Sequence, residues 1–200
     1  MKLFGILLPL LLLAGCATAP GPQTTTSHGS FPGLDSLPTH WQLNGRLSLT
    51  QGKTGWHGGV DWFQAATAFR LRVSGPLGQG GFLLSGDDRE VLLTDAAQQT
   101  YRAPDAETLL TDVTGWILPV TGLRYWIRGV PDPAMQFEAE LDSEGRLALL
   151  SQAGWTIRYT RYHTIGAGRW PARLALARED VSVRMVIDQW QFGPPAPVEP

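Results

Sequence analysis

Hydrophobic and polar residues alternate along most of the chain between residues 39 and 192, a pattern typical of β-strands with one buried face. Turn residues such as Gly86-Asp87-Asp88 and Ser143-Glu144-Gly145 separate short runs of this kind. We count about eleven strands in meander order, joined mainly by hairpins. They are marked by Leu43, Gly45, Leu47 and Leu49; Trp56, Gly58, Val60 and Trp62; Phe69, Leu71 and Val73; segments 81–86, 89–95 and 98–103; Met135, Phe137, Ala139 and Leu141; Leu147 and Leu149; Trp155, Ile157 and Tyr159; Leu174 and Leu176; and Val181, Val183, Met185 and Ile187.

The alternation stops between residues 104 and 131, where helical spacing replaces it. Asp105 can cap a helix that ends at Gly115, and a second short helix is expected after Pro119. The apolar residues of the two helices are Ala106, Leu109, Leu110 and Val113, then Leu123, Trp126 and Ile127. A large antiparallel sheet with one helical insertion predicts a mainly β fold, an unclosed antiparallel β-barrel of about eleven strands with a helical lid over an apolar cavity.

The N-terminus has the pattern of a bacterial lipoprotein export signal. Lys2 precedes an apolar stretch that is too short to span a bilayer, and Leu13-Ala14-Gly15-Cys16 follows it. We therefore expect residues 1–15 to be a signal peptide and Cys16 to carry the lipid. Enterobacterial lipoproteins that stay in the inner membrane commonly have Asp after this cysteine. Ala17 resembles outer-membrane lipoproteins instead, which predicts a domain anchored to the outer membrane and facing the periplasm.

Composition divides the rest of the chain into three parts. Residues 16–38 are rich in Thr, Ser, Gly and Pro and are expected to form a flexible tether, with a root-mean-square span of roughly 25 Å. Residues 39–192 are expected to form the folded domain. The Pro-rich residues 193–200 are expected to be a disordered tail, because proline cannot join a sheet ladder.

Charge and chemistry argue against several function classes. The net charge is −2 and the 16 Lys and Arg residues are scattered, so nucleic acid is not an expected partner. The single cysteine excludes a disulfide or a thiolate zinc site within the chain. The four histidines are dispersed, and His57 and Asp61 would lie roughly 13 Å apart on one strand, too far to share a metal or a proton. We expect no enzyme activity, no cofactor and no metal.

Several short stretches together resemble one known family. The longest is Gly115-Trp116-Ile117-Leu118-Pro119-Val120-Thr121-Gly122-Leu123-Arg124-Tyr125-Trp126-Ile127-Arg128-Gly129-Val130-Pro131. Asn44-Gly45-Arg46-Leu47, Pro76-Leu77-Gly78 and Asp188-Gln189-Trp190 also fit. With the cysteine motif, the chain resembles the outer-membrane lipoprotein receptor family LolB over nearly its whole length. It departs from the family at residues 28–40, where Pro32 and Pro38 stand in place of a longer first helix.

The resemblance implies a receptor rather than an enzyme. Members of the family take acylated lipoproteins from the periplasmic carrier LolA and release them into the inner leaflet of the outer membrane. The partners implied for this chain are therefore a LolA-like carrier, lipoprotein cargo and that leaflet. We expect a monomer that forms transient one-to-one complexes with the carrier.

The resemblance also assigns a role to the loop that contains Pro76, Leu77 and Gly78. In the family, the leucine at the position of Leu77 protrudes and helps deliver cargo to the membrane. Glycines and a proline can display such a side chain without cover from neighbouring strands. The alternative is that Leu77 packs against the end of the barrel.

The eight tryptophans, Trp56, Trp62, Trp116 and Trp126 in particular, suit either an apolar core or an acyl-chain pocket. For Arg46, a solvent-facing position is favoured over a polar contact that holds the helices closed. The residues expected to line the acyl-chain cavity are Val60, Trp62, Leu71, Phe82, Leu84, Trp116, Leu118, Leu123, Trp126, Met185 and Ile187.

Two other functions remain compatible with the sequence. An envelope scaffold lipoprotein would act through a surface patch and would have a filled barrel interior. A carrier of another lipid, such as a glycolipid or a fatty acid, would use the same cavity. Only the stretch from Gly115 to Pro131 favours receipt of lipoproteins over these two alternatives.

Overall fold

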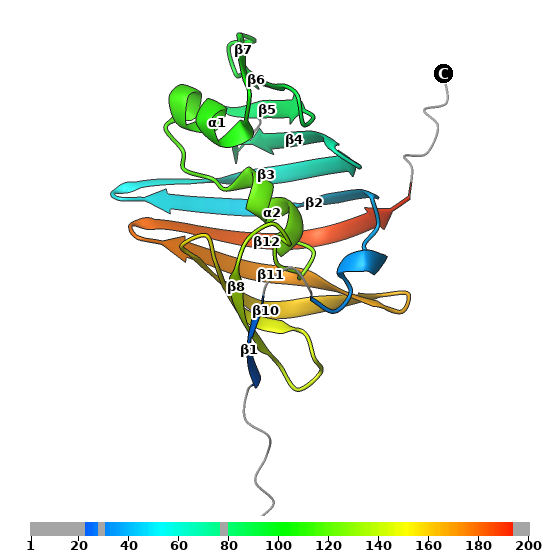
Figure 1. Ribbon diagram of the computed structural model, residues 1–200. Coiled ribbons are helices and arrows are strands. Elements are labelled where there is room, and N and C mark those ends of the chain that lie inside the picture. Colours follow the sequence, from blue (N-terminus) through cyan, green and yellow to red (C-terminus); the bar gives the residue numbers. More distant parts are fainter. Residues whose placement is uncertain (1–22, 28–30, 77–79, 194–200) are drawn as a thin grey trace, which may run out of the picture.

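The computed structural model describes residues 23–27, 31–76 and 80–193, which form one antiparallel sheet with two helices on one of its faces (Figure 1). Within these residues no helix combines the length and the apolar character needed to cross a membrane. The strands are β1 (Gln23–Ser27), β2 (His40–Gln51), β3 (Thr54–Ala65), β4 (Ala68–Ser74), β5 (Gly81–Gly86), β6 (Val91–Asp95), β7 (Thr100–Ala103), β8 (Phe137–Leu141), β9 (Leu147–Gln152), β10 (Trp155–Ile165), β11 (Gly168–Arg178) and β12 (Val181–Phe192). The helices are η1 (Leu34–Ser36, a 3-10 turn), α1 (Ala106–Thr114) and α2 (Val120–Trp126).

The sheet consists of two meanders joined side by side. Strands β2 to β7 form one meander and β8 to β12 the other, and β12 pairs with β2 along nearly its whole length. The order β1-β8-β9-β10-β11-β12-β2-β3-β4-β5-β6-β7 leaves β1 and β7 at opposite edges, so the sheet is not closed. The prediction of an unclosed antiparallel sheet of about eleven strands is confirmed: β2 to β12 occupy residues 40–192.

The twelfth strand, β1, lies within residues 16–38, which the composition predicted to be a flexible tether. Residues Gln23–Ser27 instead pair with Phe137–Leu141 of β8 and extend the sheet by one edge strand. Thr-rich sequences fit strands well, and an edge strand needs partners on one side only. The turn η1 follows in the same stretch, with Gly33 before it at φ 88°.

The two faces of the sheet differ in character. We call the face that carries α1 and α2 the inner face and the opposite one the outer face. Alternate strand residues such as Leu47, Leu174 and Met185 are buried on the inner face, in one apolar cluster with helix residues Leu110 and Leu123. Figure 1 shows both helices in front of the sheet, so the outer face lies behind it.

Arg46 follows the alternation. Its side chain is 69% exposed and pairs with Asp188 at 2.8 Å on the outer face. The prediction of a solvent-facing Arg46 is therefore confirmed.

The central pair β2 and β12 approaches closely at Gly45. This residue pairs with Ile187, next to a register shift between Ile187 and Gln189. A Cβ atom at Gly45 would overlap the carbonyl oxygen of Val186. The absence of a side chain at residue 45 therefore permits the pairing that joins the two meanders.

We expect Gly45→Ala to lower the free energy of unfolding by about 2 kcal/mol, because the backbone of β12 must shift to admit the methyl group. Gly55→Ala is the matched control, since the nearest atom to its Cβ would be 4.0 Å away. Urea unfolding of the chain from Ala17 onward would measure both. Equal stability of the two variants would contradict this account of the β2–β12 junction.

Candidate functional site

The residues predicted to line an acyl-chain cavity all lie on the inner face or in the helices and loop that cover it. Ten of the eleven have exposed fractions of 6% or less, and Trp116 is half-buried. They come from β3, β4, β5 and β12 of the sheet and from the segment that contains α1 and α2. The ten buried residues are Val60, Trp62, Leu71, Phe82, Leu84, Leu118, Leu123, Trp126, Met185 and Ile187.

Residues 104–131 form the cover, which we call the lid segment. Its first helix begins as predicted at Asp105, whose carboxylate accepts a hydrogen bond of 2.8 Å from a backbone N–H of the first turn. It ends at Gly115, which has φ 74°. The Glu107 carboxylate of α1 accepts a hydrogen bond of 2.7 Å from the N–H of Thr121 in α2. The two helices are thereby linked to each other as well as to the sheet.

Gln51, at the end of β2, links the lid segment to the sheet. Its side-chain amide donates to the carbonyl of Gly115 at 3.0 Å and accepts from the N–H of Ile117 at 3.2 Å. Both bonds are partly exposed to solvent, where the net contribution of each hydrogen bond is about 1 kcal/mol. The polar link between β2 and the loop that joins the two helices is therefore weak.

Aromatic rings complete the contact beside Gln51. The centroid of the Trp116 ring lies 4.9 Å from the ring centroid of Trp56 and 5.6 Å from that of Phe82. Trp56 and Trp116 are half-buried, and the side chain of Ile117 is 42% exposed. The loop between α1 and α2 is thus held by apolar contacts that face solvent on one side.

A buried side-chain amide holds the C-terminal end of the lid segment. Gln152 is 3% exposed, and its side-chain oxygen accepts from the Trp126 indole at 2.7 Å and from the Asp132 N–H at 2.8 Å. Its NH2 group donates to the Asp132 carbonyl at 2.8 Å. The hydroxyl of Tyr159 donates to the Trp126 carbonyl at 2.9 Å. The C-terminal end of α2 is therefore fixed to β9 and β10 by satisfied buried hydrogen bonds.

Arg128 adds a charge near the same end. Its guanidinium lies 5.7 Å from the ring centroid of Trp41 and 5.3 Å from that of Tyr125, and it donates to the carbonyl oxygens of Arg124 and Pro38. Burial lowers the pKa of Arg128 to about 10. The side chain remains a cation at neutral pH and ties α2 to the segment that precedes β2.

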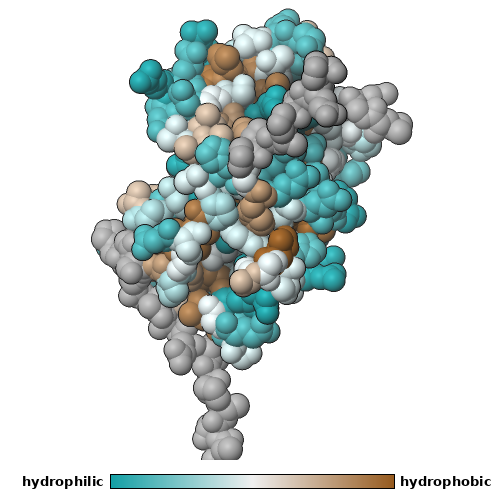
Figure 2. All heavy atoms as spheres, turned by 90° about the vertical axis from the view of Figure 1, so that its right-hand side faces the viewer, coloured by the Kyte–Doolittle hydropathy of each residue, from teal (hydrophilic) through white to brown (hydrophobic). Residues whose placement is uncertain are grey.

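A pocket lies between the lid segment and the sheet. The described residues leave a pocket of about 170 Å³ there, bordered by Trp62, Phe69, Val91, Ala106 and Val120 among others. Sites for small molecules commonly have volumes of about 300–1,000 Å³. Figure 2 shows only small apolar patches among polar residues on the side it presents. This pocket is smaller than such sites, and an acyl-chain cavity lined by the eleven residues stays a prediction.

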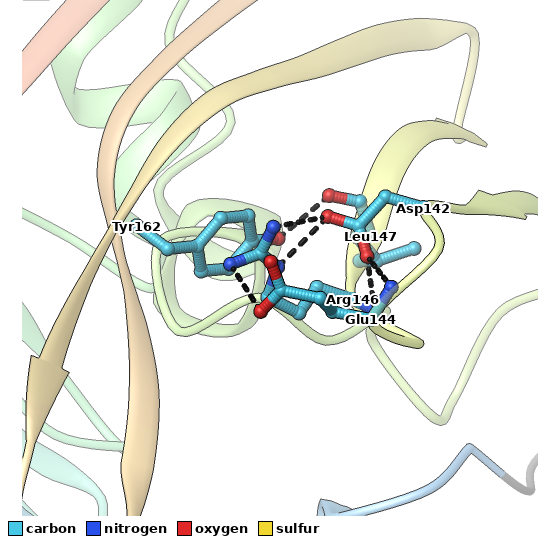
Figure 3. A network of polar contacts seen from close by, with 5 residues as sticks. All are labelled: Asp142, Glu144, Arg146, Leu147 and Tyr162. Carbon is cyan, nitrogen blue, oxygen red and sulfur yellow. Dashed lines mark hydrogen bonds and ion pairs between the residues drawn. The ribbon is translucent and has the colours of Figure 1, made fainter.

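A separate network fixes the turn between β8 and β9 (Figure 3). The Arg146 guanidinium contacts Asp142 at 2.7 Å and Glu144 at 3.1 Å and lies 4.9 Å from the Tyr162 ring centroid. The Tyr162 hydroxyl donates to the Leu147 carbonyl at 2.7 Å. Partial burial raises the pKa of Asp142, but the hydrogen bonds from Arg146 and Glu144 outweigh it and hold this pKa below its usual value. The network connects β10 to the β8–β9 hairpin and presents no group poised for catalysis.

The remaining predicted site residues are only partly described. Pro76 is exposed, and the Gly75 N–H donates to the Gly80 carbonyl at 3.3 Å, so residues 76–79 connect β4 to β5. Leu77, Gly78 and the lipidation residue Cys16 lie outside the described residues. Among the described residues, no three His, Cys, Asp or Glu side chains are grouped closely enough to hold a metal ion.

Sequence reasoning missed the polar residues that hold the lid segment. Gln51, Gln152 and Arg128 contact groups that lie 64, 20 and 90 positions away along the chain, respectively. Their local sequence contains no sign of these partners. A glutamine at a buried position of an alternating strand is the one such feature that a sequence pattern can indicate. Gln152 follows another polar residue, Ser151, at the end of β9, so the pattern gives no such indication there.

Solved structures share this arrangement of one open antiparallel sheet with helices on one face. A putative outer membrane lipoprotein-sorting protein domain from Vibrio parahaemolyticus superposes with a TM-score of 0.52 at 9% identity, over 76% of this chain and 85% of that one. A DUF1329 family protein from Desulfovibrio piger gives a TM-score of 0.51 at 7% identity, over 78% and 86%. At these identities the likeness defines the fold class, an unclosed β-barrel with a helical cover.

Sequence comparisons identify the family within that class. A family model described as outer membrane lipoprotein LolB matches residues 39–190. The outer-membrane lipoprotein LolB of Nitrosococcus oceani is 39% identical, over 94% of this chain and 96% of that protein. The LolB protein of Pseudomonas aeruginosa is 36% identical, over 96% of each. The chain belongs to the LolB family of outer-membrane lipoproteins, which confirms the resemblance seen in the sequence.

We expect Gln152→Ala to lower the free energy of unfolding by about 3 kcal/mol, because it leaves the Trp126 indole N–H and the Asp132 N–H buried without partners. Gln136→Ala removes a similar side chain from an exposed position and serves as control. Chemical denaturation monitored by tryptophan fluorescence would measure both variants. A loss below about 1 kcal/mol for Gln152→Ala would show that water or other groups replace these bonds.

Gln51→Ala should act locally. We expect a loss of no more than about 1 kcal/mol in global stability, with faster amide exchange at Ile117, whose N–H loses its acceptor. Hydrogen exchange followed by mass spectrometry would compare it with Gln42→Ala, which changes the same strand away from the lid segment. Unchanged exchange at residues 115–117 would mean that Gln51 does not hold the lid segment.

Proposed function

We propose that this protein is an outer-membrane-anchored receptor that accepts acylated lipoproteins from a LolA-like periplasmic carrier and inserts them into the inner leaflet of the outer membrane. Membership of the LolB family supports this function. The predicted lipid anchor at Cys16 would hold the domain at that membrane, facing the periplasm. The protein works as a monomer without cofactor, metal or nucleic acid, and it binds and transfers cargo rather than converting it chemically.

The observation that carries the proposal is the cover over the inner face. A mainly apolar sheet surface is covered by a short segment, residues 104–131, whose loop between α1 and α2 is held by the weak Gln51 link and half-buried rings. Strong buried bonds to Gln152 hold its C-terminal end. This asymmetry supports a hinged lid, with the hinge near Trp126 and the opening between Trp116 and Trp56.

The energetics of such a transfer need no nucleotide. When the lid segment moves aside, acyl chains replace the side chains of α1 and α2 against the inner face, so apolar surface remains covered throughout. Cargo binds the open state and shifts the equilibrium toward it. The bilayer then offers the chains a larger apolar environment, at about 0.8 kcal/mol per buried CH₂.

The test is a transfer assay with purified components. A LolA-type carrier loaded with a fluorescently labelled lipoprotein is mixed with the chain from Ala17 onward, and the two proteins are separated to see which one holds the label. Transfer of the acylated cargo, and none of the same cargo without acyl chains, supports the receptor. A folded protein that receives no label contradicts it.

The two alternatives make different predictions in the same assay. An envelope scaffold, with a filled interior, would bind neither cargo nor free lipid. A carrier of another lipid would take up a labelled fatty acid or glycolipid and leave the lipoprotein on its carrier. The family relationship and the asymmetric attachment of the lid segment favour the receptor over both.

Leu77→Glu should separate acceptance from delivery. We expect unchanged uptake of cargo from the carrier and at least about tenfold slower insertion into liposomes, because a leucine that enters the membrane interface contributes about 2 kcal/mol. Ala97→Glu adds the same charge to another exposed hairpin turn and should leave insertion unchanged. Normal insertion by Leu77→Glu would remove Leu77 from the delivery step.

A further inference from the structure

The outer face carries a large groove that the proposed function does not use. It has a volume of about 840 Å³ and crosses β11, β12, β2 and β3, the middle strands of Figure 1, behind the sheet. The strand register places two rows of outward residues along it. Arg173, Val186, Arg46 and Gly59 form one row, and Ala175, Arg184, Ser48 and His57 form the other. Both rows belong to the groove, which therefore runs between them.

The groove has a cationic rim. Arg46, Arg173 and Arg184 border it, and the register sets Arg161 beside Arg173 and Arg158 beside Ala175. All five arginines are exposed. In the part of the chain that the structure describes, only Arg46 of these five has an acidic partner, Asp188.

This clustering contrasts with the chain as a whole, whose net charge is −2. Within the described strands, the acidic side chains on the outer face are Asp61 and Asp188 near the groove and Glu138 and Glu140 on the distant strand β8. The arginines outnumber the acids near the groove, so the rim favours an anion.

The floor of the groove is apolar. Val186 and Ala175 are half-buried between the arginines, and both line the groove. Gly59 contributes no side chain, and a Cβ there would have no neighbour closer than 3.9 Å. A cationic rim above an apolar floor suits a ligand with an anionic headgroup and a hydrocarbon chain.

One end of the groove reaches the loop between β4 and β5. Gly75 and Pro76 border it there, and residues 76–79 begin at the same point. A lipid seated in the groove would therefore lie next to the loop that contains Leu77. The membrane surface supplies such lipids in quantity.

We propose that this outer groove binds an anionic phospholipid of the membrane, with its phosphate between Arg173 and Arg184 and its acyl chain over Val186 toward Pro76. The contact holds the outer face against an anionic leaflet. It brings Gly75 and Pro76, which follow β4, to the bilayer while the inner face stays free for cargo. The inference goes beyond the proposed function and does not depend on it, because lipid binding is measured without carrier or cargo.

The experiment is co-sedimentation of the chain from Ala17 onward, which retains every strand and helix, with vesicles of phosphatidylcholine alone or mixed with phosphatidylglycerol. We expect binding to the mixed vesicles only. The double variant Arg173→Glu, Arg184→Glu should bind them about 30-fold more weakly, since each arginine near an anionic surface contributes about 1 kcal/mol. Arg89→Glu, Arg178→Glu changes the net charge equally at exposed positions outside the groove and should bind nearly as the unmodified chain does.

A third variant tests the binding site for the acyl chain rather than the charge of the rim. Gly59→Leu leaves every charge in place and fills the groove, so we expect several-fold weaker binding with unchanged thermal unfolding. If Gly59→Leu binds the mixed vesicles as tightly as the unmodified chain does, the claim that an acyl chain lies in the groove is wrong. Equal losses in the two double variants would overturn the groove as the binding site. Binding of inorganic phosphate to the chain as tight as binding to the mixed vesicles, with both lost in the Arg173→Glu, Arg184→Glu variant, would identify a free-anion site and overturn the lipid.

Discussion

The need to cover one apolar face of an open sheet governs this structure. Strands β2 to β12 bury alternate residues on the inner face, and an unclosed barrel cannot bury them by curling onto itself. The lid segment supplies the missing cover with α1 and α2. Because its contacts with the sheet are mainly apolar, acyl chains can take its place with little change in the apolar area exposed to water. In the proposed function, lipid meets the same requirement when the lid segment moves aside.

The sequence predicted the elements of this fold better than their contacts. Alternation located the strands, and Asp105, Gly115 and Pro119 marked the helices correctly, because these signals are local and lie within a few residues of the feature they specify. The edge strand β1 was missed since five Thr-rich residues carry no alternating pattern. The pairing of β12 with β2 joins residues that lie about 140 positions apart in the chain, and no local pattern encodes it.

The candidate site shows the same division. Pattern and resemblance together selected seven strand residues of the helix-covered face and four residues of its cover, because period-2 alternation states which strand side chains share one face and helical spacing which residues of α2 do. The alternation does not show whether the space between the sheet and the lid segment is open. Trp126 illustrates the gap: its apolar character predicted burial, whereas its bond to Gln152, which fixes one end of the lid segment, depends on a partner 26 positions away.

The most direct test of the account is hydrogen exchange of the lid segment before and after cargo is loaded. With acylated lipoprotein bound, the account predicts faster amide exchange in α1 and in residues 115–118, with unchanged protection in β2 and β12. The same lipoprotein without acyl chains should change neither. Stable binding of the acylated cargo with an unchanged lid segment would contradict the central claim that acyl chains occupy the inner face in place of the lid.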